Sequence, residues 1–328
     1  MPATVSPGAK RLRIVIARAL PEPVLARFRS AHDVWVNPDD RTLTAEELLA
    51  QAAGADALVI TAYNRFDAAM FDRLPASVRM VATYSVGFEH IDLEAARKRG
   101  IAVLFTPDVL SDSVAEMAIL LMLGAARRVH DGTALLYGGG WGGWTPTQLV
   151  GLEITGKRLG ILGMGRIGQT IARRARGFDM QVHYHNRQRL APDLEAGATH
   201  HAALPDFLAH CDVLVLAAPS TPATRGILNA AAIGAMPEGA VVVNIARGDL
   251  VDDEALIGAL KRGRIAAAGL DVFNGEPKLD PRYTSLSNVF LQPHQGSSTM
   301  TARLKMGDIL LTGFAAIMAG RTPPNRLV

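Results

Sequence analysis

The sequence predicts an α/β protein built from two doubly wound domains with parallel sheets. The chain has 328 residues, a length that suits about two domains, each able to bury its own core. Short apolar runs alternate with helical stretches along the chain, as they do in parallel sheets covered by helices. A glycine-rich turn at residues 163–168 separates a strand signal from a helix signal, so a second series of elements begins near the middle.

The first third of the chain contains the first series. A threonine followed by two glutamates at residues 44–47 predicts a capped helix start. No glycine fingerprint follows the first strand, so we do not expect this domain to bind a nucleotide. The expected strands are residues 12–17, 34–36, 57–61, 80–84 and 101–105, and the expected helices are residues 23–30, 44–53, 68–74 and 93–99.

The second series occupies the middle of the chain. A long apolar helix at residues 113–126 precedes it, and we interpret this helix as one crossing between the domains. An amphipathic helix at residues 299–319 would return to the first domain. We therefore expect a domain of residues 109–297 inserted into a domain made of residues 1–108 and 298–328. The expected strands of the inserted domain are residues 159–162, 181–185, 213–217, 241–245 and 267–271.

The turn GMGRIG has the spacing that receives a dinucleotide pyrophosphate. Its first glycine permits a tight turn, the second lets the backbone approach the phosphates, and the third lets the helix pack against the strand. An ordinary strand–helix turn is the alternative, but the flanking strand and helix favour a Rossmann domain. The cofactor-binding candidates in the turn are Gly163, Gly165, Arg166, Ile167 and Gly168.

The residues after the next strand indicate the dinucleotide. An NAD site usually places a carboxylate there, whereas this strand ends in Asn186, Arg187 and Arg189. Because guanidinium groups attract a 2′-phosphate, we expect NADP(H). The two arginines could instead be solvated loop charges. Asn186 could bond a ribose hydroxyl, so use of NAD stays open.

Charge and hydrophobic patterning argue against nucleic-acid and membrane partners. The formal charge of +3 arises from 34 basic and 31 acidic residues without a basic block, so we expect no nucleic-acid partner. The apolar helix at residues 117–126 is too short to span a bilayer, and we expect a cytoplasmic protein without a membrane partner.

Cys211, the single cysteine, is expected to be a small semi-buried residue. In the glycine-rich loop at residues 138–144, we expect the two tryptophans to cover the edge of a core.

Three side chains after successive strands could carry chemistry. Arg247 follows a strand at the edge where ligands bind in parallel sheets, and its guanidinium can grip a carboxylate and polarise a keto oxygen. His294 is the natural acid and base, because histidine titrates near neutrality. Glu276 could bond the other ring nitrogen and fix the tautomer. Taken singly, the histidine could be structural and the glutamate a loop charge. No metal site is expected from the sequence.

Five segments follow one another in a specific order along the chain: SVGFEHID at residues 85–92, GMGRIG at 163–168, NIARG at 244–248, GLDVFNGEP at 269–277 and PHQGS at 293–297. On these segments the chain resembles the D-isomer-specific 2-hydroxyacid dehydrogenases over nearly its full length. The Asn-Arg-x-Arg strand ending and the loop at residues 84–87 look like the glyoxylate/hydroxypyruvate reductase branch. One departure is Gln295, where the family often has a small or apolar residue.

The resemblance implies a Rossmann domain inserted into a flavodoxin-like substrate domain, and a homodimer in which Trp141 reaches the partner's site. It implies that the backbone N–H groups of Val86 and Gly87 bind the substrate carboxylate, together with Arg247. His294 would be the proton donor and Glu276 its partner. The further cofactor contacts that it implies are Pro219, Ile245, Asp271 and Gly296.

The expected reaction is NADPH-dependent reduction of a small 2-oxo acid such as glyoxylate or hydroxypyruvate. Two rival functions remain open. Formate or phosphonate oxidation uses the same architecture, although the formate enzymes pair their histidine with glutamine and this chain has Glu276. Corepressors of the same superfamily keep the same motifs and sense the dinucleotide, but they tend to carry long disordered tails, and this chain stops at Val328.

Overall fold

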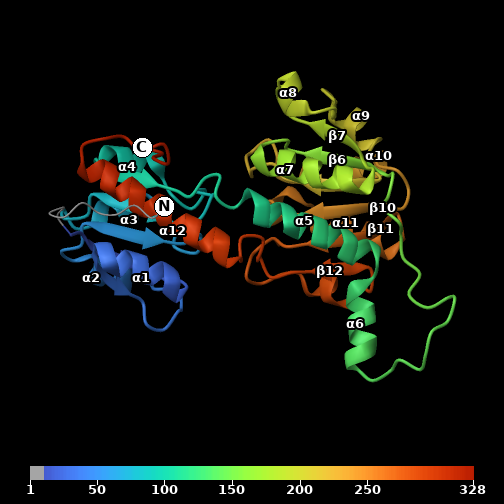
Figure 1. The fold of residues 1–328 in the computed structure, drawn as a ribbon, viewed down its shortest axis with the longest axis horizontal. Coiled ribbons are helices and arrows are strands. Elements are labelled where there is room, and N and C mark those ends of the chain that lie inside the picture. The colour runs from blue at the N-terminus through green and yellow to red at the C-terminus, as the bar shows by residue number, and fades with distance from the viewer. Residues whose placement is uncertain (1–10) are drawn as a thin grey trace. The chain divides into compact units, whose positions relative to one another are not determined.

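The computed structural model describes residues 11–328, which divide into two compact units (Figure 1). The first unit comprises the chain up to Leu110 together with Ser297–Val328, and the second comprises Ser111–Gly296. Each unit has one sheet whose strands all run parallel, and helices connect the strands. The predicted α/β fold class with two parallel-sheet domains is confirmed.

The first unit contains a five-stranded sheet in the order β2-β1-β3-β4-β5. This order is that of flavodoxin-like sheets. The chain's last residues pair antiparallel with β5, because the N–H of Leu327 donates to the carbonyl of Val103 at 2.8 Å. The strands are β1 (Arg13–Ile16), β2 (Asp33–Val36), β3 (Ala57–Ile60), β4 (Met80–Thr83) and β5 (Ala102–Leu104).

Helices cover both faces of this sheet. One face packs against α2, α3 and α4 in a core of buried apolar residues. On the other face α1 contacts α12, the long helix near the end of the chain. Thr44 and Glu47 form the predicted capping box at the start of α2, with both bonds present. The helices are α1 (Glu22–Ala31), α2 (Ala45–Ala52), α3 (Ala68–Arg73), α4 (Leu93–Lys98) and α12 (Met300–Met318).

The second unit contains a seven-stranded sheet in the order β12-β11-β10-β9-β6-β7-β8. The chain starts this sheet at β6 and builds outward in both directions, so the strand order reverses between β6 and β9. Dinucleotides bind at such a switch point, beyond the carboxyl ends of the strands. The strands are β6 (Arg158–Leu162), β7 (Gln181–His185), β8 (Thr199–His200), β9 (Val213–Leu216), β10 (Ala240–Asn244), β11 (Ile265–Leu270) and β12 (Val289–Leu291).

One face of this sheet packs against α5 and α7, and the other packs against α9, α10 and α11. The α-helices are α5 (Ser111–Ala126), α6 (Val129–Tyr137), α7 (Arg166–Ala175), α8 (Pro192–Glu195), α9 (Leu204–Leu208), α10 (Ala230–Ala235) and α11 (Asp253–Lys261). Three short 3-10 helices complete the unit, η1 (Arg176–Phe178), η2 (Gly248–Leu250) and η3 (Pro281–Ser285).

Cys211 is fully buried in the core, deeper than the semi-buried position that its sequence context predicts. Its thiol donates to the carbonyl of Phe207 at 3.2 Å. Burial raises the pKa of the Cys211 thiol, so the thiol stays protonated and is not a nucleophile. A Cβ at Gly160 would lie only 2.0 Å from the sulfur, so α9 and the chain after it pack directly on the backbone of β6.

The prediction that the two loop tryptophans cover a core edge is wrong for this chain. Trp141 is 54% exposed and Trp144 is 79% exposed. The segment that carries them, residues 138–153, follows α6 and contains no helix or strand, which agrees with the loop predicted at residues 138–144 (Figure 1). Since the loop extends beyond the core, its apolar side chains find no core to cover.

Of the helices in the described part of the chain, none combines the length and apolar character needed to cross a bilayer.

Candidate active site

The three candidate catalytic side chains come from loops that follow β10, β11 and β12. Arg247 lies three residues after Asn244, the last residue of β10. Glu276 lies in the loop after β11, and His294 lies in the loop after β12. Because these strands are neighbours and parallel, their carboxyl ends meet at one edge of the sheet. The fold thus brings residues distant in sequence to one place.

His294 and Glu276 form a direct pair. The Nδ1 atom of His294 lies 2.7 Å from Oε2 of Glu276. The second carboxylate oxygen, Oε1, accepts the backbone N–H of Phe273 at 2.8 Å, so both oxygens of the glutamate are held. His294 has a φ of +52°, a left-handed conformation that few residues other than glycine adopt. Such local strain concentrates at functional sites, where neighbouring bonds maintain it.

The neighbours of Glu276 favour its ionised form. Burial favours the neutral form of Glu276, but the hydrogen bond and charge of His294, the N–H of Phe273 and the charge of Arg247 together lower the pKa of the carboxyl. Glu276 is therefore an anion at neutral pH. The His294 side chain is 45% exposed, so its other nitrogen can reach a ligand.

The buried residue Asp271 positions the loop of His294. Its two carboxylate oxygens accept the backbone N–H groups of Gln295 and Gly296, each at 2.8 Å. Its backbone carbonyl accepts the N–H of His294 at 2.8 Å, and its own N–H donates to the carbonyl of Asn244 at 3.0 Å. Burial raises the pKa of Asp271, and the two backbone donors oppose that shift. The residue therefore connects the ends of β10 and β11 with the histidine loop.

Arg247 is positioned by a residue that the sequence analysis did not assign. Asn244 is 1% exposed, its Nδ2 donates to the carbonyl of Arg247 at 2.9 Å, and its Oδ1 accepts the N–H of Ala246 at 3.0 Å. The asparagine closes the turn after β10 and directs the chain that carries the guanidinium. The only signal for this role was its place in the NIARG segment. An asparagine that bonds its neighbouring backbone is typical of such turns.

The glycine turn lies between β6 and α7, as predicted, although α7 begins at Arg166, inside the GMGRIG segment. Gly163 has a φ of +99°, and a Cβ there would lie 2.6 Å from the backbone nitrogen of Ala218. A Cβ at Gly168 would lie 2.5 Å from the carbonyl oxygen of Gly163, so the helix packs closely on the turn. Both glycines are required by the backbone.

The start of α7 has the character of an anion site. Gly165 is the N-cap residue, and no side chain caps the first turn of this helix. A Cβ built at Gly165 would meet no atom within 4 Å, so a ligand can approach the backbone there. The N–H groups of Arg166, Ile167 and Gly168 occupy the helix positions that lack an intrahelical acceptor. These residues fit a dinucleotide pyrophosphate.

The residues in the loop after β7 that suggested NADP(H) differ in their partners and exposure. Asn186 uses its Oδ1 to accept the N–H of Met164 at 2.7 Å, so it joins the β7 loop to the glycine turn. The guanidinium of Arg189 is bound at both ends by Glu195, with distances of 2.8 and 3.0 Å. Arg187 is exposed. No carboxylate follows β7 directly in the sequence, but the fold brings Glu195 back to this loop from α8.

Glu195 is the second residue whose part the sequence did not reveal. It is 5% exposed, and it accepts hydrogen bonds from Arg189 and from the hydroxyl of Tyr184. The bonds from Arg189 and Tyr184 lower the pKa of Glu195 to about 2. The pair thus stays ionised and keeps Arg189 against α8. No sequence pattern relates residues 189 and 195, since they meet only because the chain turns at α8.

The other predicted contacts lie in loops after strands. Pro219, Ile245 and Gly296 follow β9, β10 and β12 of the second unit, in the same edge of the sheet as the glycine turn. Val86 and Gly87 lie in the first unit, in the loop after β4. There the hydroxyl of Ser85 donates to the carbonyl of Gly87 at 2.6 Å.

Residues 119–296 match the family model described as D-isomer specific 2-hydroxyacid dehydrogenase, NAD binding domain. Among relatives, the chain is 44% identical to a glycerate dehydrogenase of Hyphomicrobium methylovorum over 90% of this chain and 92% of the relative. It is 40% identical to a glyoxylate reductase of Thermococcus kodakarensis over 96% of each chain.

The fold of the chain is also similar to that of a solved structure. This structure is an NADPH-dependent glyoxylate/hydroxypyruvate reductase from Sinorhizobium meliloti in complex with NADP and malonate. The similarity has a TM-score of 0.86 at 31% sequence identity and covers 97% of each chain.

We predict that Asp271→Asn destabilises the second unit by about 1–3 kcal/mol, because an amide cannot accept both backbone N–H groups and leaves one buried donor unpaired. Urea unfolding followed by circular dichroism measures the change. Asp193→Asn, at an exposed position in α8, is the matched control and should unfold like the parent chain. Equal midpoints for Asp271→Asn and the parent would contradict the role of this carboxylate.

Proposed function

The chain belongs to the D-isomer-specific 2-hydroxyacid dehydrogenase family, and from that premise we propose that it reduces small 2-oxo acids with NADPH, using His294 as the proton donor. Glyoxylate and hydroxypyruvate are the proposed substrates. The observation that carries the proposal is the 2.7 Å contact between Nδ1 of His294 and Glu276, at the sheet edge that also bears Arg247. A polarised keto oxygen, a proton and a carboxylate site are what such a reduction requires.

His294 supplies the proton from the nitrogen that Glu276 does not hold. Glu276 keeps the ring in the tautomer in which Nδ1 carries a hydrogen, and its negative charge stabilises the imidazolium before transfer. Nε2 then donates to the keto oxygen as negative charge develops there. A bound NADPH would supply the hydride. Asp271 keeps the histidine loop in place through its bonds to the two following N–H groups.

Arg247 offsets the charge on the keto oxygen and binds the carboxylate of the substrate. A guanidinium is always charged and presents parallel donors, which suits a 2-oxo acid whose two oxygen-bearing groups are adjacent. The resemblance also makes the backbone N–H groups of Val86 and Gly87 candidates for binding a substrate carboxylate. A carbonyl compound without a carboxylate would lose the contact with Arg247, and it should be a poor substrate for that reason.

The proposed coenzyme is NADPH, with its pyrophosphate at the start of α7 and its 2′-phosphate at the loop after β7. Support comes from Arg187, whose exposed guanidinium follows the strand where an NAD site would place a carboxylate. The relative from Sinorhizobium meliloti, crystallised with NADP, adds a precedent within the family. Arg189 is held by Glu195, so the proposal places the main phosphate contact at Arg187.

The proposed assembly is a homodimer, as the resemblance implies. The segment from α6 to residue 152 exposes large apolar side chains, among them Tyr137 at 91% and Trp144 at 79%. Contiguous exposed apolar surface is typical of protein interfaces. Trp141 belongs to this segment, so a partner that covers it would place the residue as the resemblance implies.

A substrate panel tests the proposed function. We expect glyoxylate and hydroxypyruvate to be reduced, with NADPH oxidation followed by absorbance, whereas glycolaldehyde, which lacks the carboxylate, should be reduced far more slowly. The panel should be run with NADH as well. No turnover above background with any 2-oxo acid would overturn the proposal, and turnover of formate with NADP⁺ would favour the rival oxidation.

We predict that Arg187→Ala raises the KM for NADPH by about 10–100-fold and leaves the KM for NADH within about twofold, because a hydrogen bond to a charged group contributes about 1.5–3 kcal/mol. Arg189→Ala is the matched control, with a smaller effect since Glu195 already holds its guanidinium. Steady-state kinetics with both coenzymes measures the difference. Equal losses with NADPH and NADH in Arg187→Ala would remove the argument for the 2′-phosphate.

A further inference from the structure

Histidines are concentrated at one edge of the second unit, away from the catalytic histidine. Five of the nine histidines lie between residues 183 and 210, in or after β7, β8 and α9. Three of them, His183, His201 and His210, form a cluster with Asp206, and the distances between their ring centroids are 4.8–5.2 Å. None of these residues takes part in the proposed reduction.

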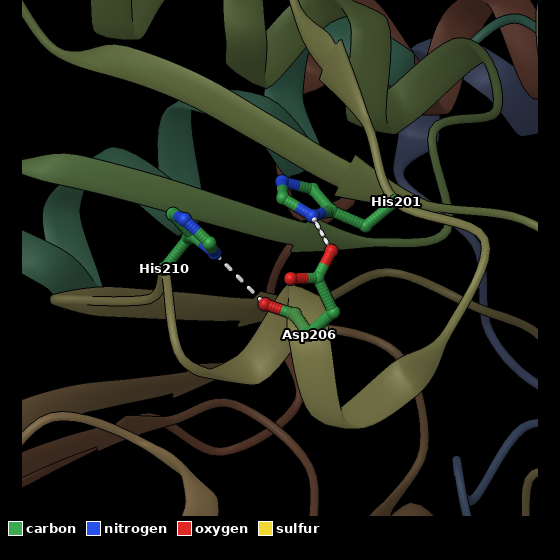
Figure 2. A group of neighbouring side chains, drawn as sticks. All are labelled: His201, Asp206 and His210. Carbon is green, nitrogen blue, oxygen red and sulfur yellow. Dashed lines mark hydrogen bonds and ion pairs between the residues drawn. The ribbon is translucent and has the colours of Figure 1, made fainter.

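The members of the cluster are aligned by hydrogen bonds. His201 places its Nδ1 2.5 Å from Oδ2 of Asp206, and His210 donates from its Nδ1 to the backbone carbonyl of Asp206 at 2.8 Å. Figure 2 shows both rings presenting a nitrogen toward Asp206 from different sides. One ring nitrogen from each histidine and one carboxylate oxygen lie within 4.8 Å of one another.

We propose that His201, Asp206 and His210 bind a divalent transition-metal ion of the Zn²⁺ class, with water in the remaining position. Imidazole nitrogens combined with a carboxylate suit zinc, whose bonds to nitrogen and oxygen are about 2.0–2.2 Å long. The ion would take the place of the proton between His201 and Asp206. Small movements of two side chains would bring the three donors into its coordination sphere.

The surroundings favour an ion over three protonated rings. His201 is 7% exposed, and His183 lies against it, so a positive charge on each ring would place like charges about 5 Å apart. Burial and the neighbouring rings His201 and His210 lower the pKa of His183. The hydrogen bond from His201 lowers the pKa of Asp206. Neutral imidazole and ionised carboxylate are the forms that ligate metals.

His183 has the place of a positioning residue. Its Nδ1 lies 2.9 Å from Nε2 of His201, the nitrogen that does not face Asp206. When Nδ1 of His201 binds the ion, the ring proton lies on Nε2. This N–H then donates to Nδ1 of His183. Metal-bound histidines usually donate their other N–H in this way, and loss of such a partner weakens metal binding by about 10–100-fold.

The ion would connect β8 with α9 near the edge of the sheet. His201 directly follows β8, whereas Asp206 lies in α9 and His210 just after it. The same segment packs on the sheet through Phe207 and Cys211, which contact β6 at Gly160. Metal binding here would therefore stabilise the edge of the second unit without entering the catalytic chemistry, and the proposal does not depend on the proposed substrate.

Cobalt titration of the full-length, chelator-treated protein tests this site. We expect one Co²⁺ per chain with visible absorption bands, displacement of those bands by Zn²⁺, and a higher Tm with Zn²⁺. His210→Gln and Asp206→Asn should weaken binding more than about 100-fold and abolish the Tm increase. His183→Asn should retain the cobalt spectrum but weaken affinity about 10–100-fold, which a merely structural role would not produce.

Two controls make the titration specific. His200→Gln changes the neighbouring histidine, whose ring contacts Tyr184 at 5.0 Å between centroids and does not belong to the cluster, so it should bind Co²⁺ like the parent chain. Glu276→Gln tests the other histidine–carboxylate pair and should also bind like the parent. The side chain of Asp206 is 60% exposed, so Asp206→Asn should fold like the parent chain. If His210→Gln does not fold, loss of Co²⁺ binding in Asp206→Asn tests the site by itself.

Absence of cobalt bands in the parent chain would overturn the proposal. Equal affinity in the parent, His210→Gln and Asp206→Asn would overturn it too, as would binding that only Glu276→Gln removes. Failure of the substrate panel would leave this result unaffected, because the titration needs neither coenzyme nor substrate.

Discussion

The buried carboxylate of Asp271 is the interaction on which the candidate active site depends. Its two oxygens bind consecutive N–H groups of the loop after β12, and its backbone binds both His294 and the end of β10. This arrangement holds His294 in a left-handed conformation and directs its ring to Glu276. An acid–base pair with defined orientation thus follows from one charged residue at the end of a parallel strand.

The sequence predicted the fold because its main signals are local. Apolar runs gave the central strands of both sheets, and the glycine spacing gave the turn before α7. The short elements were missed, since a two-residue strand such as β8 and a four-residue helix such as α8 are too short to show a period. Helix α6 was missed as well, because none of its residues is buried and its sequence shows no apolar face directed at a core.

The sequence predicted those residues of the candidate site that lie in loops directly after strands. Arg247, Glu276 and His294 could be placed at one sheet edge because successive parallel strands share it. The bond between Arg189 and Glu195 could not be predicted, since it depends on how the chain turns at α8. The exposure of Trp141 and Trp144 could not be predicted either, because composition favours burial and only the path of the segment decides it.

The most direct test of the account is the pH dependence of 2-oxo acid reduction in Glu276→Gln and in the parent chain. If Glu276 stabilises the imidazolium that donates the proton, its neutral replacement should move the alkaline limb of kcat/KM to lower pH. Glu254→Gln, on the exposed side of α11, should leave the profile unchanged. Superimposable profiles for the parent and Glu276→Gln would contradict the proposed role of the pair.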